Sequence, residues 1–237
     1  MARRKREPET AAIESVTHDG RGIAATDGKK VFVSGALAGE IVTFVRRKSR
    51  RNYDEAELLE VIEASSERID ARCEAFDRCG GCSMQHISAE RQREIKSQTL
   101  RDNLERIGRV EPDDWLQPMT GPLWNYRRRA RLAVKDVRAK GRTLVGFRER
   151  HAPFIADMRR CEVLVEPIDG MIAELSELIS GLSIRARLPQ IEVAVADDAI
   201  ALVFRVLDPP SDTDEVALRE FAVRHSLRLY LQTGGLD

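Results

Sequence analysis

CEAFDRCGGCSMQHI, residues 73–87, contains three of the chain's four cysteines within ten positions. The fourth, Cys161, lies 79 residues beyond Cys82 in MRRCEVL. The first three follow the spacing C-x5-C-x2-C, and Gly80 and Gly81 stand between the last two. Because glycine has no side chain, this loop can fold tightly around a bound group and point its amides at the sulfur atoms. The pattern predicts a site made of four thiolates, with Cys161 as the distant ligand.

Three kinds of chemistry fit four cysteines in this pattern. Structural zinc accepts four thiolates, but its sites usually contain two C-x2-C pairs, whereas this chain has one pair and two single cysteines. A 4Fe–4S cubane is larger, tolerates uneven spacing and often takes three ligands from one loop and one from afar. Thiols without a metal, or a disulfide, are the third alternative. The spacing favours the iron–sulfur cluster and leaves the other two open.

The composition describes a globular protein of one large domain or two smaller ones. Of its 237 residues, 42% are hydrophobic and 33% are charged, which allows a sizeable core. No apolar run approaches the ~20 residues that a membrane span needs, and MARRKREPET at the start lacks the apolar stretch of a signal peptide. We therefore expect a cytoplasmic protein that is not bound to a membrane. In that compartment, clustered cysteines bind metals or act in redox chemistry more often than they form disulfides.

The charges balance overall but not along the chain. The formal net charge is zero, from 39 Lys and Arg against 39 Asp and Glu. Residues 1–51 carry twelve basic and six acidic side chains, residues 125–161 carry twelve and three, and residues 162–237 carry six and fourteen. This gradient predicts a basic surface for a polyanion, with ordinary solvated surface as the alternative.

Residues 9–67 are predicted to form a small β-barrel after a basic tail over residues 1–8. Short β-prone runs alternate with turn signals. Two Asp-Gly pairs, at 19–20 and 27–28, have the chemistry of hairpin turns because glycine tolerates a positive φ. Four or five strands, without a helix long enough to cover a sheet, favour a closed or nearly closed barrel of the OB type.

Residues 68–237 are predicted to form an α+β domain, with a helix and a proline-rich connection over about 88–124. The helix starts at Ser88, a good N-cap, and stops at Gly108. Its apolar stripe consists of Ile95, Leu100, Leu104 and Ile107. The elements expected after it are strands over 126–137, 143–150 and 154–164, a helix over 171–182, a hairpin over 191–208 that turns at Asp197-Asp198, a helix over 215–226 and a strand over 227–232.

The cysteine pattern, continued by MQHI and matched to a distal cysteine in a GFRER…CEVL context, resembles the iron–sulfur-containing RNA uracil-5-methyltransferases. Within that family it is most similar to the bacterial 23S ribosomal RNA branch, and the resemblance extends over nearly the whole chain. HDGRGIA followed by VFVSGALAGEIV resembles the start of a TRAM domain, the OB-like RNA-binding module at the N-terminus of these enzymes. WNYRRRARLAV and LVGFRERHAPFIADMRRCEVL resemble strands of their central iron–sulfur domain.

The resemblance implies a ligand set, a partner and a reaction. The family's 4Fe–4S ligands fall on Cys73, Cys79, Cys82 and Cys161. The partner is 23S ribosomal RNA, and the methyl donor is S-adenosylmethionine. The family methylates carbon 5 of a uridine after a cysteine adds to carbon 6, with a carboxylate as base, in a C-terminal Rossmann-like domain.

The residues for that catalytic step are not found in this sequence. All four cysteines are assigned to the cluster, and no strand, glycine-rich loop and helix follow one another in a way that would hold S-adenosylmethionine. The one late glycine pair, Gly234-Gly235, opens no helix. We therefore expect no catalytic or cofactor-binding residues in this chain, which corresponds to the N-terminal portion of such an enzyme. By itself it is expected to bind RNA without methylating it.

Basic side chains in two places are the candidate RNA contacts. Arg127, Arg129 and Arg131 alternate along a predicted strand, so they emerge on one face about 6.6 Å apart, roughly the phosphate spacing of a single strand. Carboxylates packed along that face are the alternative. The second place is RRKSRR, residues 46–51, which is predicted to be a barrel loop that reaches RNA phosphates through Arg46, Arg47 and Lys48. The alternative is that this segment is simply an exposed turn.

Two functions therefore stand. One is the RNA-binding, cluster-bearing part of an S-adenosylmethionine-dependent ribosomal RNA uracil-5-methyltransferase, present as a monomer. The other is a free-standing RNA-binding module with a structural metal site. A reading frame downstream of Asp237 with a glycine-rich loop and a Pro-Cys nucleophile would favour the first.

Overall fold

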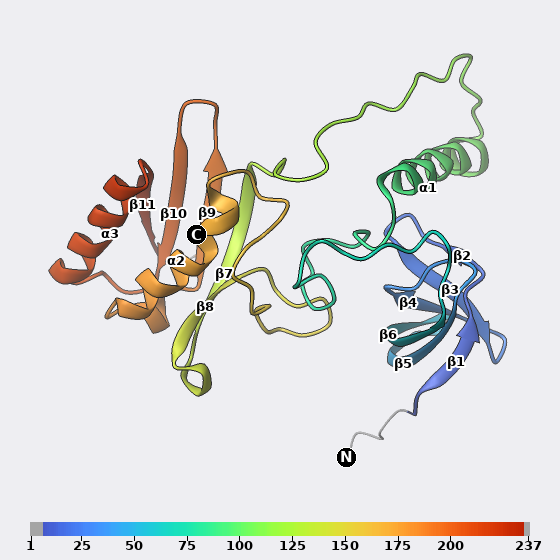
Figure 1. Cartoon of the computed structure of the whole chain (residues 1–237), viewed down its shortest axis with the longest axis horizontal. Coiled ribbons are helices and arrows are strands. Elements are labelled where there is room, and N and C mark those ends of the chain that lie inside the picture. The colour runs from blue at the N-terminus through green and yellow to red at the C-terminus, as the bar shows by residue number, and fades with distance from the viewer. Residues whose placement is uncertain (1–6, 235–237) are drawn as a thin grey trace. The chain divides into compact units, whose positions relative to one another are not determined.

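A computed structural model describes residues 7–234, so most of the predicted basic tail lies outside the described residues. Contacts divide the chain into two units, whose elements are labelled in Figure 1. The first contains the residues up to Arg72 together with Cys82–Thr120, and the second contains Cys73–Gly81 together with the residues from Gly121 onward. This division reflects packing and does not test the domain boundary predicted at residue 68. Each unit is described by itself.

The first unit is built on a curled six-stranded sheet. Its order is β1-β5-β6-β4-β3-β2, and neighbours are antiparallel except for β4 and β6. β1 and β2 form opposite edges although only Ile13 and Glu14 separate them in the sequence, so the sheet has to curl until its edges approach. The strands are β1 (Glu9–Ala12), β2 (Ser15–Val16), β3 (Arg21–Thr26), β4 (Lys29–Ser34), β5 (Ile41–Ser49) and β6 (Tyr53–Glu63).

The inside of this curled sheet is filled by every second side chain of its strands, because successive residues of a strand point to opposite faces. β4 and β5 both send alternate side chains inward. The turn at 27–28 joins β3 to β4, and Asp27 and Gly28 both have positive φ, 54° and 72°, as a two-residue type I′ hairpin requires. The predicted turn is therefore confirmed, with six strands in place of four or five. The core consists of Ile13, Ala24, Val31, Val33, Ala36, Val42, Phe44 and Ala56.

Gly22 lies where the segment between β1 and β2 crosses the sheet. A Cβ on Gly22 would lie 2.8 Å from Cγ2 of Ile13 and 2.9 Å from Cβ of Ala36. We expect Gly22→Ala to lower the free energy of unfolding by about 1–3 kcal/mol through overpacking, as measured by urea denaturation. Gly121→Ala, whose Cβ would meet nothing within 4 Å, is the control and should change little. Equal stability of the two variants would contradict this packing.

The helix that follows the cysteine loop has the predicted start. Ser88 caps α1 (Ala89–Asp102), and its hydroxyl accepts the Arg91 N–H at 3.2 Å. The helix continues as the π-helical turn η1 (Asn103–Gly108) and ends at Gly108, as predicted, although the left-handed residue that terminates it is Arg109.

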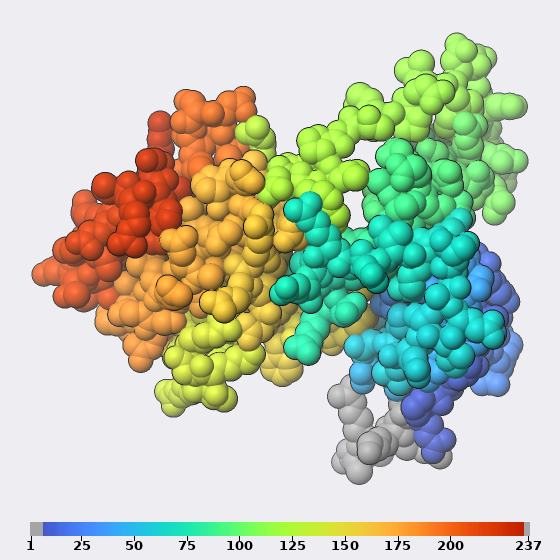
Figure 2. All heavy atoms as spheres, viewed as in Figure 1, coloured from blue at the N-terminus to red at the C-terminus, as the bar shows by residue number. Residues whose placement is uncertain are grey.

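Half of the predicted apolar stripe of this helix is exposed. Ile95 packs into the cluster of Leu37, Met84 and Ile87, and Leu104 is half-buried, whereas Leu100 and Ile107 are 53% and 78% exposed. The light green segment after η1, with Leu116 and Met119 almost fully exposed, is an extended run of atoms in Figure 2. The amphipathic pattern therefore predicts the helix correctly but overestimates how much of its apolar stripe is buried.

The second unit contains a five-stranded mixed sheet in the order β11-β10-β9-β7-β8. Neighbours are antiparallel except β10 and β11, which α3 connects as a crossover. Helix α2 packs against β8 through its buried apolar face, and Thr143 N–H donates to Ser180 Oγ at 2.9 Å. The elements are β7 (Arg129–Val137), η2 (Arg138–Lys140), β8 (Arg142–Gly146), α2 (Ile168–Gly181), η3 (Arg185–Arg187), β9 (Gln190–Val195), β10 (Ile200–Val206), α3 (Asp212–Arg224) and β11 (Arg228–Thr233).

One predicted element of this unit is wrong. Residues 154–164 form no strand; their β-type pairing is limited to the isolated bridges Arg148↔Ile155 and Arg127↔Leu164. At the end of the segment, the N–H of Cys161 donates to Asp169 O on α2 rather than to a ladder partner on a strand. The remaining strands and both helices are present within a few residues of their predicted bounds, so the α+β class is confirmed. In the described part of the chain, no helix combines the length and apolar character that a membrane crossing requires.

Candidate functional site

The cysteine loop is a tight turn held by its own backbone. The N–H of Phe76 donates to Cys73 O at 3.0 Å, and the N–H of Cys79 donates to Ala75 O at 2.7 Å. Phe76 and Cys79 are buried, at 4% and 6% exposure. The guanidinium carbon of Arg150 lies 5.1 Å from the Phe76 ring centroid and covers the loop. The hydrogen bonds of the turn therefore hold Cys79 in a buried position.

Gly80 and Gly81 follow at positions where a side chain would crowd its neighbours. The N–H of Gly80 donates to Arg148 O at 2.9 Å, and a Cβ on Gly80 would lie 3.1 Å from that oxygen. A Cβ on Gly81 would lie 3.3 Å from both Cys79 Sγ and the Phe147 ring. The N–H of Gly81 donates to Cys79 Sγ at 3.3 Å. The amide-to-sulfur contact expected of this glycine pair is present.

Cys161 is held at the entrance to α2. Its N–H donates to Asp169 O at 2.9 Å, its own carbonyl accepts the Leu164 N–H at 3.2 Å, and it is 4% exposed. Arg160 donates to the Asp169 carboxylate at 2.6 Å, so the residue before the cysteine is anchored to the same aspartate. The distant cysteine is thus buried and fixed by the first turn of a helix.

The chemistry of these residues fits an iron–sulfur cluster. Cys79 and Cys161 are buried, Cys73 and Cys82 are partly exposed, and one sulfur already accepts a backbone N–H. Cys73, Cys79 and Cys161 belong to the second unit, and Cys82 is the first residue of the segment Cys82–Thr120. Across residues 7–234, no three His, Cys, Asp or Glu side chains are grouped to hold a metal ion. The four-cysteine ligand set stays a prediction.

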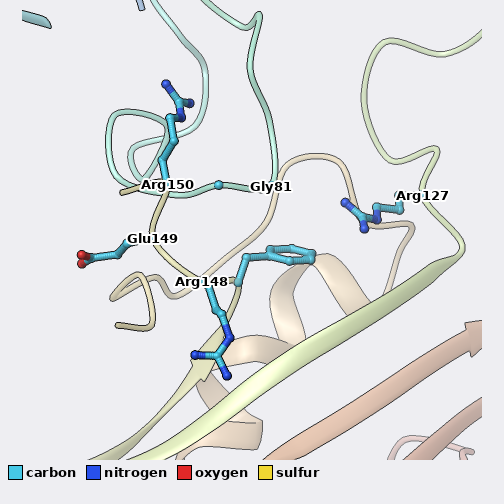
Figure 3. A pocket seen from close by; sticks show the side chains of 7 residues that line it. Gly81, Arg127, Arg148, Glu149 and Arg150 are labelled. Atoms are coloured by element: carbon cyan, nitrogen blue, oxygen red, sulfur yellow. The ribbon is translucent and has the colours of Figure 1, made fainter. Parts of the chain in front are cut away.

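A basic pocket of about 430 Å³ lies beside the glycine pair. Figure 3 shows its lining residues, with the Arg127 side chain pointing toward an aromatic ring. The guanidinium carbon of Arg127 lies 4.9 Å from the centroid of Phe147, a cation–π contact. Arg148, Glu149 and Arg150 line the pocket as well. Sequence reasoning missed Arg148 and Arg150, although their alternation in GFRER was a visible signal.

The predicted row of three arginines is split by the structure. Arg129 and Arg131 lie on β7 and are exposed, while Ala130 and Leu132 between and after them are buried, as the alternation predicts. Arg127 lies before β7 in an isolated bridge, and its Nε donates to the Arg129 carbonyl at 3.0 Å. Across the β7–β9 pair, Arg131 also meets a carboxylate, since its Nε lies 3.2 Å from Glu192. The RNA contacts stay predictions.

Arg46 is engaged inside the first unit. Its nitrogens donate to Glu9, Asp54 and Thr26 at 2.6–2.8 Å, and its side chain is 16% exposed. The hydrogen bond to Glu9 and that to Asp54 raise the pKa of Arg46 above its ordinary value despite burial. Burial raises the pKa of Asp54, but hydrogen bonds from Lys29, Arg46 and other donors outweigh it and hold that pKa below its ordinary value. These contacts give Arg46 a structural role and do not test its predicted RNA contact.

The other two candidates lie at the end of β5, which extends through Ser49. Residues 46–49 are thus strand, and the exposed turn is limited to residues 50–52. Arg47 pairs with Glu57 at 2.5 Å on the surface, and Lys48 is exposed. Surface pairs of this kind are weak, so both charges remain accessible to a polyanion.

Comparison with known proteins identifies relatives. Residues 3–59 match the TRAM domain family. The chain is 48% identical to the "23S rRNA (uracil(1939)-C(5))-methyltransferase RlmD" of Alcanivorax borkumensis, over 99% of this chain and 54% of that protein. It is 49% identical to the protein of the same name from Aromatoleum aromaticum, over 94% of this chain and 52% of that protein. The chain spans about half the length of the curated relatives it matches.

The fold is also found among solved structures. One is the crystal structure of Pyrococcus abyssi tRNA (uracil-54, C5)-methyltransferase in complex with S-adenosyl-L-homocysteine. The match has a TM-score of 0.63 and 20% sequence identity, and it covers 88% of this chain and 48% of that one. At that identity the likeness shows the fold alone.

Proposed function

Because this chain is a homologue of the RlmD-family 23S rRNA uracil-C5 methyltransferases over about half their length and carries a TRAM domain, we propose that it is the RNA-binding, 4Fe–4S-bearing part of such an enzyme. The observation that carries the proposal is the 48% identity over nearly the whole chain. We further propose that it acts on 23S ribosomal RNA in the cytoplasm.

In this proposal the chain's own residues bind and position RNA. S-adenosylmethionine would supply the methyl group, and this chain is assigned no residue that binds it. Cys73, Cys79, Cys82 and Cys161 would hold the 4Fe–4S cluster, which takes one thiolate per iron. Methyl transfer moves no free electron, so we assign the cluster a structural role, in which it would link the cysteine loop to the segment before α2. The OB-like sheet and the basic residues around β7 would then contact the RNA backbone.

The RNA contacts of β7 can be tested by salt dependence. Each phosphate neutralised on single-stranded RNA contributes about 0.7 to the slope of log affinity against log salt. We expect the combined change of Arg127, Arg129 and Arg131 to Ala to flatten the slope by about two units. Binding to different sequences should weaken about equally, because phosphate contacts carry no base identity. Fluorescence anisotropy over a range of salt measures both quantities.

The matched control changes three arginines far from β7 in the sheet order. Arg219, Arg224 and Arg228 lie on or next to α3 and β11, at the opposite edge, and are exposed. Their replacement by Ala removes the same charge and should leave the slope nearly unchanged. An unchanged slope in a folded β7 triple variant would mean that carboxylates such as Glu192 neutralise this face and that RNA binds elsewhere.

A further inference from the structure

The basic pocket beside the glycine pair contains two arginines whose charge the fold does not neutralise. Within the described residues, neither Arg127 nor Arg148 has an ion pair with a carboxylate, whereas many other arginines of the chain do. Arg148 is exposed and donates from Nη1 to Pro153 O at 3.0 Å, while within the described residues its Nη2 and Nε donate to no protein acceptor. An arginine in a pocket whose guanidinium N–H groups have no protein acceptor can donate them to a bound anion.

The pocket is built so that these donors stay in place. The Phe147 ring is 9% exposed and packs on Gly81 on one side, while Arg127 contacts the ring at 4.9 Å. Arg127 is fixed a second time, because its Nε donates to Arg129 O. A guanidinium that is already ordered by a ring and a carbonyl loses little further entropy when it binds an anion.

The charge of the lining favours an anion over a cation. Three arginines and one carboxylate, Glu149, line the pocket. In Figure 3 the Glu149 carboxylate points away from the side on which Arg127 lies. Arg150 donates to Phe76 O at 3.2 Å, so it supports the cysteine loop and adds its charge from there. Two arginines thus remain to contact a ligand directly.

We infer that this pocket binds a phosphodiester group of single-stranded RNA, with Arg148 and Arg127 as its donors. A repeating polyanion is favoured over an isolated anion because the exposed Arg129 follows Arg127 at the start of β7 and, within the described residues, has no ion pair either, so the positive charge continues beyond the pocket. The inference rests on the proposed RNA-binding function and adds to it a specific phosphate position beside the cysteine loop. Arg148, which the sequence pattern did not single out, is its central residue.

The test compares Arg148→Gln with wild type in the whole chain, using a fluorescein-labelled single-stranded oligouridylate as the probe. Loss of one phosphate contact should lower the salt slope by about 0.7. Because this contribution vanishes near 1 M salt, affinity at about 0.1 M salt should fall about 5-fold. Arg148→Lys keeps the charge and should retain most of the slope. Arg224→Gln, an exposed arginine at the opposite edge of the sheet, should bind like wild type.

The outcomes separate the pocket from the wider proposal. A wild-type slope in Arg148→Gln would overturn the phosphate site while leaving RNA binding intact. An Arg148→Lys variant as weak as Arg148→Gln would overturn it as well, since the effect would then follow the contact to Pro153 rather than charge. If polyglutamate competes with the probe as well as unlabelled oligouridylate does, the ligand of the pocket would be an acidic peptide and the inferred RNA site would be wrong. Wild-type protein that binds no oligouridylate would defeat the proposed function itself.

Discussion

Cys161→Ser protein purified without oxygen is expected to lose its iron, whereas wild-type protein should be brown and contain about four irons and four sulfides per chain. The reason is that a closed cubane takes four thiolates and the chain has four cysteines. Cys161 is 4% exposed and held by the first turn of α2, so a hydroxyl there would replace a thiolate in a fixed position. Iron and acid-labile sulfide assays and the visible absorption spectrum measure the loss.

The matched control is Val163→Ala, which removes packing two residues away without removing a thiol. Val163 is equally buried, at 4% exposure, so a general loss of packing would affect both variants. We expect the control to keep its iron and Cys161→Ser to lose it while circular dichroism shows both folded. Wild-type protein that is colourless, with one tightly held zinc and no sulfide, would contradict the cluster and favour the zinc alternative.

Glu40→Gln is expected to lower the free energy of unfolding by about 3 kcal/mol, the lower end of the range for breaking a buried ion pair. Glu40 is fully buried and accepts from Arg68, at 2.5 and 2.8 Å, and from the N–H groups of Leu37 and Ser65. Gln keeps the shape but removes the charge that Arg68 faces. The lower end applies because the Arg68 side chain is 23% exposed and can regain water.

The same variant predicts a change in pH dependence. Burial raises the pKa of Glu40, but the hydrogen bonds from Arg68, Leu37 and Ser65 outweigh it, so the pKa lies below its ordinary value. A carboxyl whose pKa is lower in the folded than in the unfolded state stabilises the fold above the unfolded pKa, about 4.3, and this contribution is lost as pH falls through the folded pKa. Wild type should therefore lose stability below about pH 4.3 more steeply than Glu40→Gln.

Urea denaturation at several pH values, followed by circular dichroism, measures both effects. Glu60→Gln is the matched control, since Glu60 is exposed on β6 of the same sheet, and its stability should follow wild type at every pH. A Glu40→Gln protein as stable as the control at neutral pH would mean that Arg68 is fully solvated and that the pair does not hold the end of β6.

Local chemistry carried most of the fold prediction. The Asp-Gly turn at 27–28, the Ser88 cap and the alternation of Arg129 and Arg131 with buried neighbours depend on residues within a few positions of one another, and each is found. Register and period are local properties, so the sequence predicted the α+β class and most strands and helices.

The hydrogen-bond partners that a residue finds on other elements were decided by the tertiary structure. Residues 154–164 have the composition of a strand, but Cys161 donates to Asp169 on α2, and no composition encodes that choice. Arg46 lies in a basic run that predicts an RNA contact, yet Glu9 on β1 and Asp54 on β6 bind its guanidinium. A charge looks the same in the sequence whether or not a carboxylate faces it in the fold.

The candidate site divides along the same line. The four cysteines and the glycine pair were evident in the sequence, because thiolate chemistry and glycine's missing side chain do not depend on context. The pocket of Arg127, Phe147 and Arg148 was not, since it forms only when the loop after Cys79 pairs with the chain after β8, through Gly80 N–H and Arg148 O. The sequence by itself determined which groups can bind a metal or a phosphate. Only the tertiary structure decided which of those charges stay unpaired, because pairing depends on distances between segments that lie far apart in the chain.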